Sequence, residues 1–390
     1  MLLAGTLPYS ISRNGRKELR KTRSMLEVLF NSFSASKILI WPVLIMGFLI
    51  SGCSSTSEQF WADPMDETES MDYSVIYYIH ADSDYLYHNA DGKQVRGNSK
   101  VLDTAFRVAE EAKSGEVFIF YQRPEEKFLG LFPSRNSRLY NYTKGELISQ
   151  VNYRHTDKNE EFLTTEARLY NQYRTHSGKE NRRTHFLYFG HEIPDGEGKK
   201  YHLTSPDVAV NTGSFSEGIQ MFLGTDNQRF DLVVLSTCNN GTPVMAEHLM
   251  LFSDVLLASP QNLHLSHIDS ESLDLLESEP GISSIQLAHS MADQTYSRLE
   301  SETQTAITLT VYDFEIVQEY QNELHAFSMA YDTLGSKQYF SDNVDCNQVE
   351  FFDDDTFRKG LKTWYKPAKF GRKSLTTTHS GWGCKPLTEN

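Results

Sequence analysis

The stretch LVVLSTCNNGTPVMAEHL, residues 232–249, joins an apolar run, a cysteine and the start of a helix. Residues 232–235 are too few for a helix and include two β-branched valines, which predicts a buried strand of a mostly parallel sheet. Thr242 and Pro243 fit the cap and the first turn of a helix. Cys238 lies between this strand and this helix, at the edge where open α/β sheets bind ligands. Its thiol is either a nucleophile or a small residue that fills the core.

Strands and helices alternate along the rest of the chain. Strands are expected at 73–79, 116–121, 185–190, 231–237, 254–259 and 306–312, a hairpin at 128–153, and helices at 101–112, 160–176, 215–223, 243–252, 282–299 and 314–329. This order predicts an α/β fold, a three-layer sandwich with a mostly parallel central sheet and helices on both faces. Ser214 and Glu217 have the spacing of a capping box for the helix at 215–223. Residues 337–390 show no clear period.

The N-terminal region resembles a lipoprotein leader. The uncharged run at 38–50 is thirteen residues long, which is short for a membrane span and typical of a signal peptide. It ends in the sequence ISGC, which resembles a bacterial lipobox with Cys53 as the lipidated residue. We therefore expect a signal peptide over 1–52 and a lipidated flexible tether over 53–72. An uncleaved anchor is the alternative, and translation from Met25 would shorten the leader.

The charge of the chain bears on its partners. The net charge is −15, and loss of residues 1–52 makes it more negative, because that segment holds seven basic and two acidic residues. Nucleic acid is excluded as a partner, since phosphate binding needs basic clusters. Membrane contact is expected through the Cys53 lipid alone. Ser54 follows the cysteine, which favours the outer membrane of the cell envelope, on its periplasmic or surface face. We expect a monomer without a cofactor.

The four cysteines divide into three roles. Cys53 is assigned to lipid, and Cys346 and Cys384 could form a disulfide in an oxidising periplasm. Cys238 then stays unpaired, and a single leftover thiol in an exported protein is a candidate reactive group.

A histidine follows the neighbouring strand. His191 comes directly after the strand expected at 185–190, as Cys238 follows the strand at 231–237. Right-handed crossovers place such strand ends side by side, so the two side chains can meet. Cysteine beside an imidazole is the minimal dyad for acyl transfer. The alternative for His191 is a loop histidine without a role.

A metal enzyme is the weaker alternative. His264, His267 and Asp269 form an H-x-x-H-x-D pattern. Without a further ligand motif in a strand or helix, such a pattern is more typical of a solvated loop than of a metal site. We therefore expect no metal.

Several segments together resemble the clostripain-like cysteine peptidases, which have the caspase–hemoglobinase fold. The opening strand SVIYYIHADSDYLYHN, the STCNNG turn around Cys238 and the order of histidine before cysteine carry the likeness, together with FSDVLLASPQNLHLSHIDSESL and ITLTVYDFEIVQEYQNEL. The family has Asn where this chain has Asp84, and glycine after its histidine where this chain has Glu192. The resemblance covers roughly residues 73–329.

The resemblance implies a role for each site residue. Cys238 becomes the nucleophile and His191 the general base, while the backbone N–H groups of Cys238 and Glu192 become the oxyanion donors. Family members that cut after Arg or Lys often carry an acid two residues before the nucleophile, where this chain has Ser236. Asp269 and Glu271 are the acids that remain near the expected substrate pocket.

The predicted function is a lipid-anchored cysteine endopeptidase that hydrolyses peptide bonds in a protein or peptide substrate. Its peptidase domain is expected over 73–332, with a loop-rich extension packed on it over 333–390. The alternative is a caspase-fold lipoprotein that has lost hydrolysis and serves as an envelope binding module.

Overall fold

A computed structural model describes most of the chain from residue 70 onward. The described residues are 70–81, 86–88, 94–123, 126–128, 132–134, 137–155, 160–175, 182–200, 207–224, 229–263, 267–335, 346–371, 374 and 377–384. The expected signal peptide, Cys53 and most of the tether lie outside them. Within these ranges, no helix is both long and apolar enough to cross a membrane.

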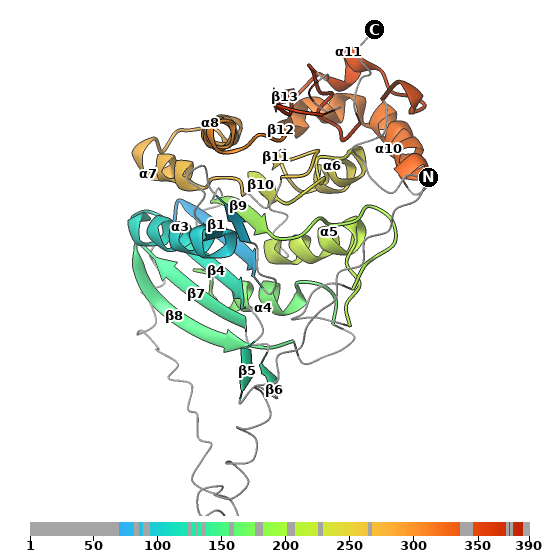
Figure 1. Cartoon of the computed structure of the whole chain (residues 1–390). Helices are drawn as coiled ribbons and strands as arrows, with labels where there is room; N and C mark the ends of the chain where they lie inside the picture. The colour runs from blue at the N-terminus through green and yellow to red at the C-terminus, as the bar shows by residue number, and fades with distance from the viewer. Residues whose placement is uncertain are drawn as a thin grey trace, which may run out of the picture. The chain divides into compact units, whose positions relative to one another are not determined.

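A nine-stranded sheet forms the centre of the structure (Figure 1). Its strands, in order across the sheet, are β13 (Leu361–Lys366), β12 (Ile307–Asp313), β11 (Val255–Ala258), β10 (Leu232–Ser236), β9 (Arg183–Phe189), β1 (Tyr73–His80), β4 (Glu116–Gln122), β7 (Ser137–Thr143) and β8 (Glu146–Tyr153). The five strands from β11 to β4 are parallel, and each edge adds two antiparallel strands. The predicted α/β class with a parallel core is confirmed.

Helices cover both faces of this sheet (Figure 1). One face carries α3 (Gly97–Glu111), α7 (Leu275–Ser278) and α8 (Ser284–Glu302), and the other carries α4 (Thr164–Tyr173), α5 (Thr212–Gln220), α6 (Pro243–Leu249) and α10 (Gln321–Gly335). Shorter elements are β2 (Leu86–His88), β3 (Gln94–Arg96), β5 (Glu126–Phe128), β6 (Phe132–Ser134), η2 (Met221–Leu223), η3 (Glu271–Asp274), α9 (Phe314–Val317), η4 (Gln318–Tyr320), η6 (Cys346–Gln348) and α11 (Asp354–Phe357). The predicted sandwich is therefore present.

The apolar run of β10 is explained by burial on both faces. Val233 and Leu235 belong to one core cluster, whereas Leu232 and Val234 belong to the other. A strand between two helical layers has no solvent-facing side, so it shows no alternation of polar residues.

One expected strand runs in the opposite direction. The alternation of elements implied that β12 would be parallel, but it pairs antiparallel with β11. The reason lies in the path of α8. Its N-terminus is near the start of β9, where Arg183 Nη1 donates to Ile282 O at 3.1 Å. Its later turns reach the segment at 267–270, which is bonded to the end of β10, and there Arg298 contacts Asp269. The chain thus crosses the molecule before α8 begins, and β12 starts at the edge where the parallel strands end.

The helix caps were predicted with mixed success. Thr242 is the N-cap of α6, accepting from Met245 N at 3.1 Å, and Pro243 is in the first turn, as predicted. The capping box of α5 was placed wrongly. Its N-cap is Asn211, which accepts from Ser214 N while Ser214 Oγ accepts from Asn211 N. An asparagine three residues upstream offered the same cap chemistry.

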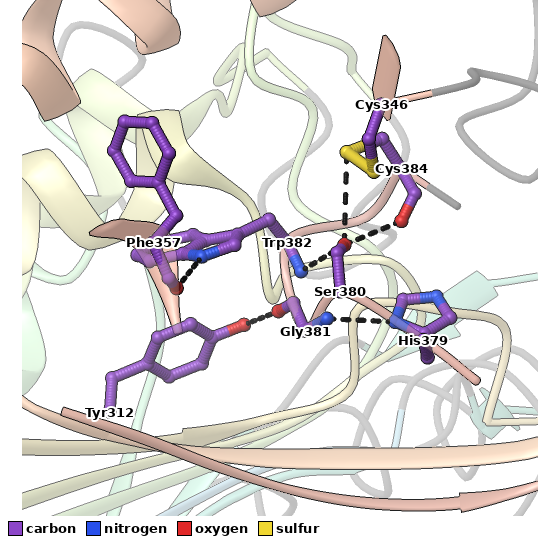
Figure 2. Close-up of a disulfide and its surroundings, with 8 residues drawn as sticks. All are labelled: Tyr312, Cys346, Phe357, His379, Ser380, Gly381, Trp382 and Cys384. Carbon is purple, nitrogen blue, oxygen red and sulfur yellow. Dashed lines mark hydrogen bonds between the residues drawn. A yellow bond between two sulfur atoms is a disulfide. The ribbon is translucent and has the colours of Figure 1, made fainter. Parts of the chain in front are cut away.

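The C-terminal segment contributes to the sheet and to the core. Its strand β13 extends the sheet beyond β12, although no period marked it in the sequence. Cys346 and Cys384 form a disulfide with Cα atoms 4.9 Å apart, as Figure 2 shows. Next to it, the fully buried Trp382 donates from Nε1 to Phe357 O at 2.7 Å, and the Tyr312 hydroxyl donates to Gly381 O. The disulfide therefore closes a loop that packs against β12 through Tyr312, on the face of the sheet that α10 covers.

Candidate functional site

The sheet register brings His191 and Cys238 to neighbouring positions. Phe189 of β9 is paired with Ser236 of β10, and each site residue lies two positions beyond its member of that pair. Gly190 N donates to Ser236 O at 3.4 Å, which continues the pairing past the strands. Since adjacent strands lie about 4.8 Å apart, the two side chains leave the sheet next to each other. Both residues are partly exposed.

Asn240 links the loops that carry these residues, which we call the histidine loop (residues 190–195) and the nucleophile loop (residues 237–242). Its Oδ1 accepts from Ile193 N at 3.0 Å and its Nδ2 donates to Ile193 O at 2.7 Å. The Thr237 hydroxyl also donates to Oδ1, at 2.6 Å. Asn240 is fully buried, so these bonds satisfy polar groups that water cannot reach. This role was not predicted from the sequence, although two asparagines directly after the cysteine were a visible signal.

Glu192 and Asn239 form a second link, on the exposed side. Asn239 Nδ2 donates to Glu192 Oε2 at 2.7 Å. The described residues with positive φ outside glycine are Lys144, Leu163, Asn239 and Phe351, so Glu192 is not in a conformation that requires the family's glycine. The left-handed residue is instead Asn239, with φ of 55°. Asparagine tolerates this region better than most residues, which suits the turn after Cys238.

Cys238 contacts the turn that follows β11. Its Sγ donates to Asn262 Oδ1 at 3.0 Å. Asn239 N donates to Gln261 O at 3.0 Å and Gly241 N donates to Ser259 O at 3.0 Å, so two backbone bonds lie beside the thiol contact. Cys238 is in no disulfide and packs at the margin of the core.

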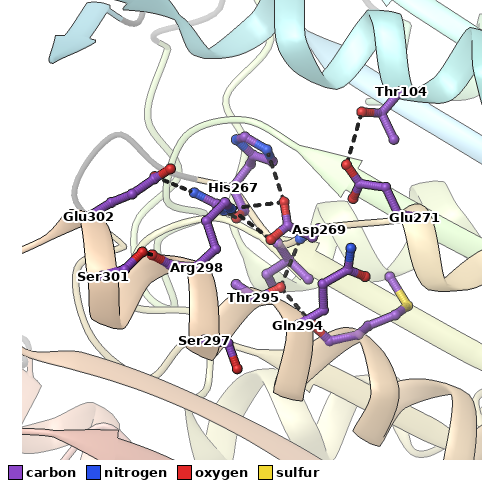
Figure 3. Close-up of polar contacts among 12 residues, drawn as sticks. Thr104, His267, Asp269, Glu271, Gln294, Thr295, Ser297, Arg298, Ser301 and Glu302 are labelled. Atoms are coloured by element: carbon purple, nitrogen blue, oxygen red, sulfur yellow. Dashed lines mark hydrogen bonds and ion pairs between the residues drawn. The ribbon is translucent and has the colours of Figure 1, made fainter. Parts of the chain in front are cut away.

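The predicted pocket residues Ser236 and Asp269 lie close together at the end of β10, the strand that precedes Cys238. Ser236 is buried, and its Oγ accepts from Ile268 N at 2.8 Å. This bond holds residues 267–270, which we call the pocket loop, against the end of β10. Asp269 N donates to Thr295 Oγ1 of α8 at 2.8 Å (Figure 3). The pocket loop is thus fixed from both sides.

The Asp269 carboxylate is occupied by an arginine. Arg298 Nε lies 2.7 and 3.0 Å from its two oxygens, and Arg298 Nη2 donates to His267 O at 2.6 Å (Figure 3). Burial acts to raise the pKa of Asp269, but His267 and Arg298 outweigh it and hold that pKa below its usual range. Burial also lowers the pKa of His267. Because the charge of Asp269 is already compensated, a substrate cation would have to compete with Arg298.

Glu271 lies further from the thiol. It begins η3 and is partly exposed, and its Oε1 accepts from the Thr104 hydroxyl of α3 at 3.5 Å (Figure 3). Its described hydrogen bond is to α3 and not to Ser236 or Asp269. Glu271 therefore belongs to the junction of η3 with α3.

Asp195 is an acid that the sequence analysis did not single out. It ends the histidine loop, and its Oδ1 accepts from Thr212 Oγ1 at 2.8 Å and from Thr242 Oγ1 at 3.1 Å. Burial raises the pKa of Asp195 to about 7, the two hydroxyls lower it in part, and Asp332 and Glu192 raise it further. The carboxyl group ties the histidine loop to the first residues of α5 and to the cap of α6.

Two other kinds of site were tested by the geometry. In the described ranges, no three His, Cys, Asp or Glu side chains cluster as metal ligands, and His264 of the H-x-x-H-x-D pattern lies outside those ranges. A cavity of about 370 Å³ lies between α3, the start of β1 and α7, lined among others by Tyr73, Val108 and Leu276. It is at the edge where the parallel strands begin, opposite to Cys238.

Comparisons with known proteins give only distant likenesses. No family model matches the chain, and no curated protein matches it. Among solved structures, a secreted C11 cysteine protease from Bacteroides thetaiotaomicron in complex with an irreversible peptide inhibitor is similar with a TM-score of 0.45 and 12% identity, over 67% of this chain and 70% of that one. An inactive zymogen C11 protease from Parabacteroides distasonis is similar with a TM-score of 0.46 and 13% identity, over 82% of this chain and 92% of that one.

Proposed function

We propose that the chain is a cysteine endopeptidase, with Cys238 as nucleophile and His191 as general base. One observation carries the proposal. His191 and Cys238 lie at matching positions beyond the paired residues Phe189 and Ser236, and the loops that bear them are joined through Asn240. Nucleophile and base on adjacent loops of a rigid sheet edge are the arrangement that acyl transfer needs.

The proposed reaction proceeds through a thioester. The Cys238 proton passes to the His191 imidazole, and the sulfur bonds to the peptide carbonyl carbon. The carbonyl oxygen takes the electron pair and accepts hydrogen bonds from the N–H groups of Cys238 and Glu192. The C–N bond then breaks, and His191 gives its proton to the leaving amine. Water attacks the thioester carbon while His191 takes a proton from the water. The C–S bond then breaks, the acid leaves, and His191 returns the proton to the sulfur.

We expect only a weak preference for substrates with Arg or Lys before the cleaved bond. Ser236 has no charge, and its hydroxyl is bonded to the pocket loop. Asp269 is bound by Arg298, and Glu271 faces α3. A substrate cation is bound strongly where it meets an uncompensated carboxylate in a partly desolvated pocket, and none of these three residues offers one.

Anchoring through Cys53 is part of the proposal. The ISGC sequence after the apolar run supports it, as does the acidic, polar segment that follows. Attachment to the outer membrane would leave the peptidase domain, residues 73–332, on a flexible tether. A Cys53→Ser variant should remain an unprocessed precursor that leaves the detergent phase on partitioning, and unchanged partitioning would exclude the lipid.

The catalytic proposal is tested with a thiol-directed peptide probe. The wild-type chain should be labelled at Cys238, as shown by peptide mass mapping. His191→Ala should lose labelling by on the order of a hundredfold or more, since general-base help contributes about that much. His325→Ala makes the same change at an exposed position of α10 and should label normally. Equal labelling of the His191 and His325 variants would contradict the dyad.

The binding-module alternative is supported by one observation, the hydrogen bond from Cys238 Sγ to Asn262 Oδ1. A thiol held in this way carries its proton and is a poor nucleophile. If the alternative holds, the wild-type chain takes up iodoacetamide at Cys238 but no peptide probe, and His191→Ala changes neither result.

A further inference from the structure

The turn that bears Asn262 is built against the nucleophile loop. Asn239 N and Gly241 N donate to carbonyl oxygens of residues 261 and 259, each at 3.0 Å. Gly241 allows this approach, because a Cβ atom there would lie only 2.7 Å from Pro260 N. Two residues that follow Cys238 are therefore bonded to the residues before Asn262.

Buried hydrogen bonds to the neighbouring strand β12 also fix this turn. Ser259 Oγ donates to Thr308 O at 2.8 Å, and Thr308 Oγ1 donates to Gln261 Oε1 at 2.8 Å. These three residues are buried, whereas Asn262 is exposed. The position of the turn thus depends on its neighbours and not on the Asn262 side chain, so this side chain can be changed without loss of the turn.

The contact with Asn262 depends on the proton of the thiol. An amide oxygen only accepts hydrogen bonds, so Cys238 Sγ can bond to Asn262 Oδ1 only while it is protonated. A hydrogen bond made by the neutral form alone opposes ionisation. We propose that Asn262 is a positioning residue that holds the Cys238 thiol protonated at rest, so that the thiolate forms only when the sulfur leaves this bond.

This inference rests on the proposed role of Cys238 as nucleophile, and it adds a control on that role. A peptide that enters the site displaces the thiol from Asn262, and the proton then passes to His191 as the sulfur bonds to the carbonyl carbon. The resting protein keeps its sulfur from reaction with other electrophiles, because the thiolate is the reactive form.

The test measures alkylation of Cys238 by iodoacetamide in the full chain from acid to alkaline pH, with the modified peptide counted by mass spectrometry. The thiolate sulfur bonds to the reagent's carbon and iodide leaves, so the rate follows the thiolate fraction. Asn262→Ala should shift the profile to lower pH and speed alkylation near neutrality about two- to tenfold, the size of one hydrogen bond. Asn262→Asp should slow it, since a carboxylate beside the sulfur repels the thiolate.

The opposite signs separate this role from a structural one. A loosened turn would change the alkylation rate of both variants in the same direction. The proposal is therefore overturned if Cys238 is alkylated faster in both variants, or more slowly in both. It is also overturned if the Asn262→Ala profile matches that of the wild type. Asn322→Ala makes the same change on the exposed side of α10 and should leave the profile in place.

Peptide hydrolysis is followed in parallel. Shifted profiles without hydrolysis contradict the peptidase proposal alone, and hydrolysis with unshifted profiles contradicts this inference alone.

Discussion

The nucleophile loop and the pocket loop both lie at the edge where the parallel strands end, but different forces hold them. The nucleophile loop is fixed mainly by bonds between neutral groups, above all the amide of Asn240 and the backbone of the turn after β11, and it contains no ion pair among the described contacts. The pocket loop is fixed by ions, because Arg298 binds both oxygens of Asp269 and the carbonyl of His267 (Figure 3).

This difference suits the roles that we propose for the two loops. The bonds of the Asn240 amide position the histidine loop and the nucleophile loop without a buried charge between them. The ion pair makes a rigid wall, but it uses the carboxylate that could have selected a substrate cation. A buried pair is also strongly coupled, since removal of one partner leaves the other uncompensated.

The largest effect is expected from Arg298→Met, which removes the cation and keeps most of the apolar stem. Asp269 is then left in a site where its side chain is only 3% exposed. Loss of one partner of a buried pair costs about 3–5 kcal/mol, and the 14% exposure of Arg298 places the expected loss near the lower end. Urea denaturation measures the change in the free energy of unfolding.

A matched control is the exposed pair of Arg358 and Asp354, whose side chains are 54% and 43% exposed. Arg358→Met should cost at most about 1 kcal/mol, because solvent screens such pairs. Addition of Asp269→Asn to the Arg298 variant should recover part of the loss. Equal losses for the two arginine variants would show that ions do not hold the pocket loop.

The next effect is expected from Asn240→Ala. It leaves the buried N–H and C=O groups of Ile193 without their side-chain partners, which costs about 1–3 kcal/mol of stability. The histidine loop also loses its tie to the nucleophile loop, so labelling of Cys238 by a peptide probe should fall on the order of ten- to a hundredfold.

Two controls separate misplacement from general damage. Thr237→Ser keeps the hydroxyl that donates to Asn240 and should label normally. Alkylation by iodoacetamide needs the thiol alone, so it should change much less than probe labelling in Asn240→Ala. A parallel fall in both reactions would mean that Asn240 supports the fold without placing His191.

The sequence predicted what depends on local pattern and failed where distant segments meet. The burial of β10 and the cap at Thr242 followed from apolar runs and cap chemistry. The reversal of β12 could not be foreseen, because it results from the route taken before α8. The pairing of Asp269 with Arg298 joins residues 29 positions apart and leaves no periodic trace. Asn240 stood next to the cysteine, but only the structure shows that its amide faces Ile193.

The smallest effect concerns Asp195, whose carboxyl group accepts hydrogen bonds from Thr212 and Thr242 and so holds the histidine loop. Burial raises its pKa to about 7 from 3.8, so the folded chain binds this proton more tightly than the unfolded chain does. The stability it contributes is complete below about pH 4 and is lost as the pH rises through about 7. Asp195→Asn cannot ionise and should therefore be more stable than the wild type above pH 7 in urea titrations, with little difference in acid. Burial also raises the pKa of Asp231, to about 6. The free energy of unfolding therefore still changes with pH in both proteins. If Asp195→Asn is less stable than the wild type at every pH, the hydroxyls of Thr212 and Thr242 need an ionised carboxylate as their acceptor. The histidine loop would then be held by a charge, as the pocket loop is.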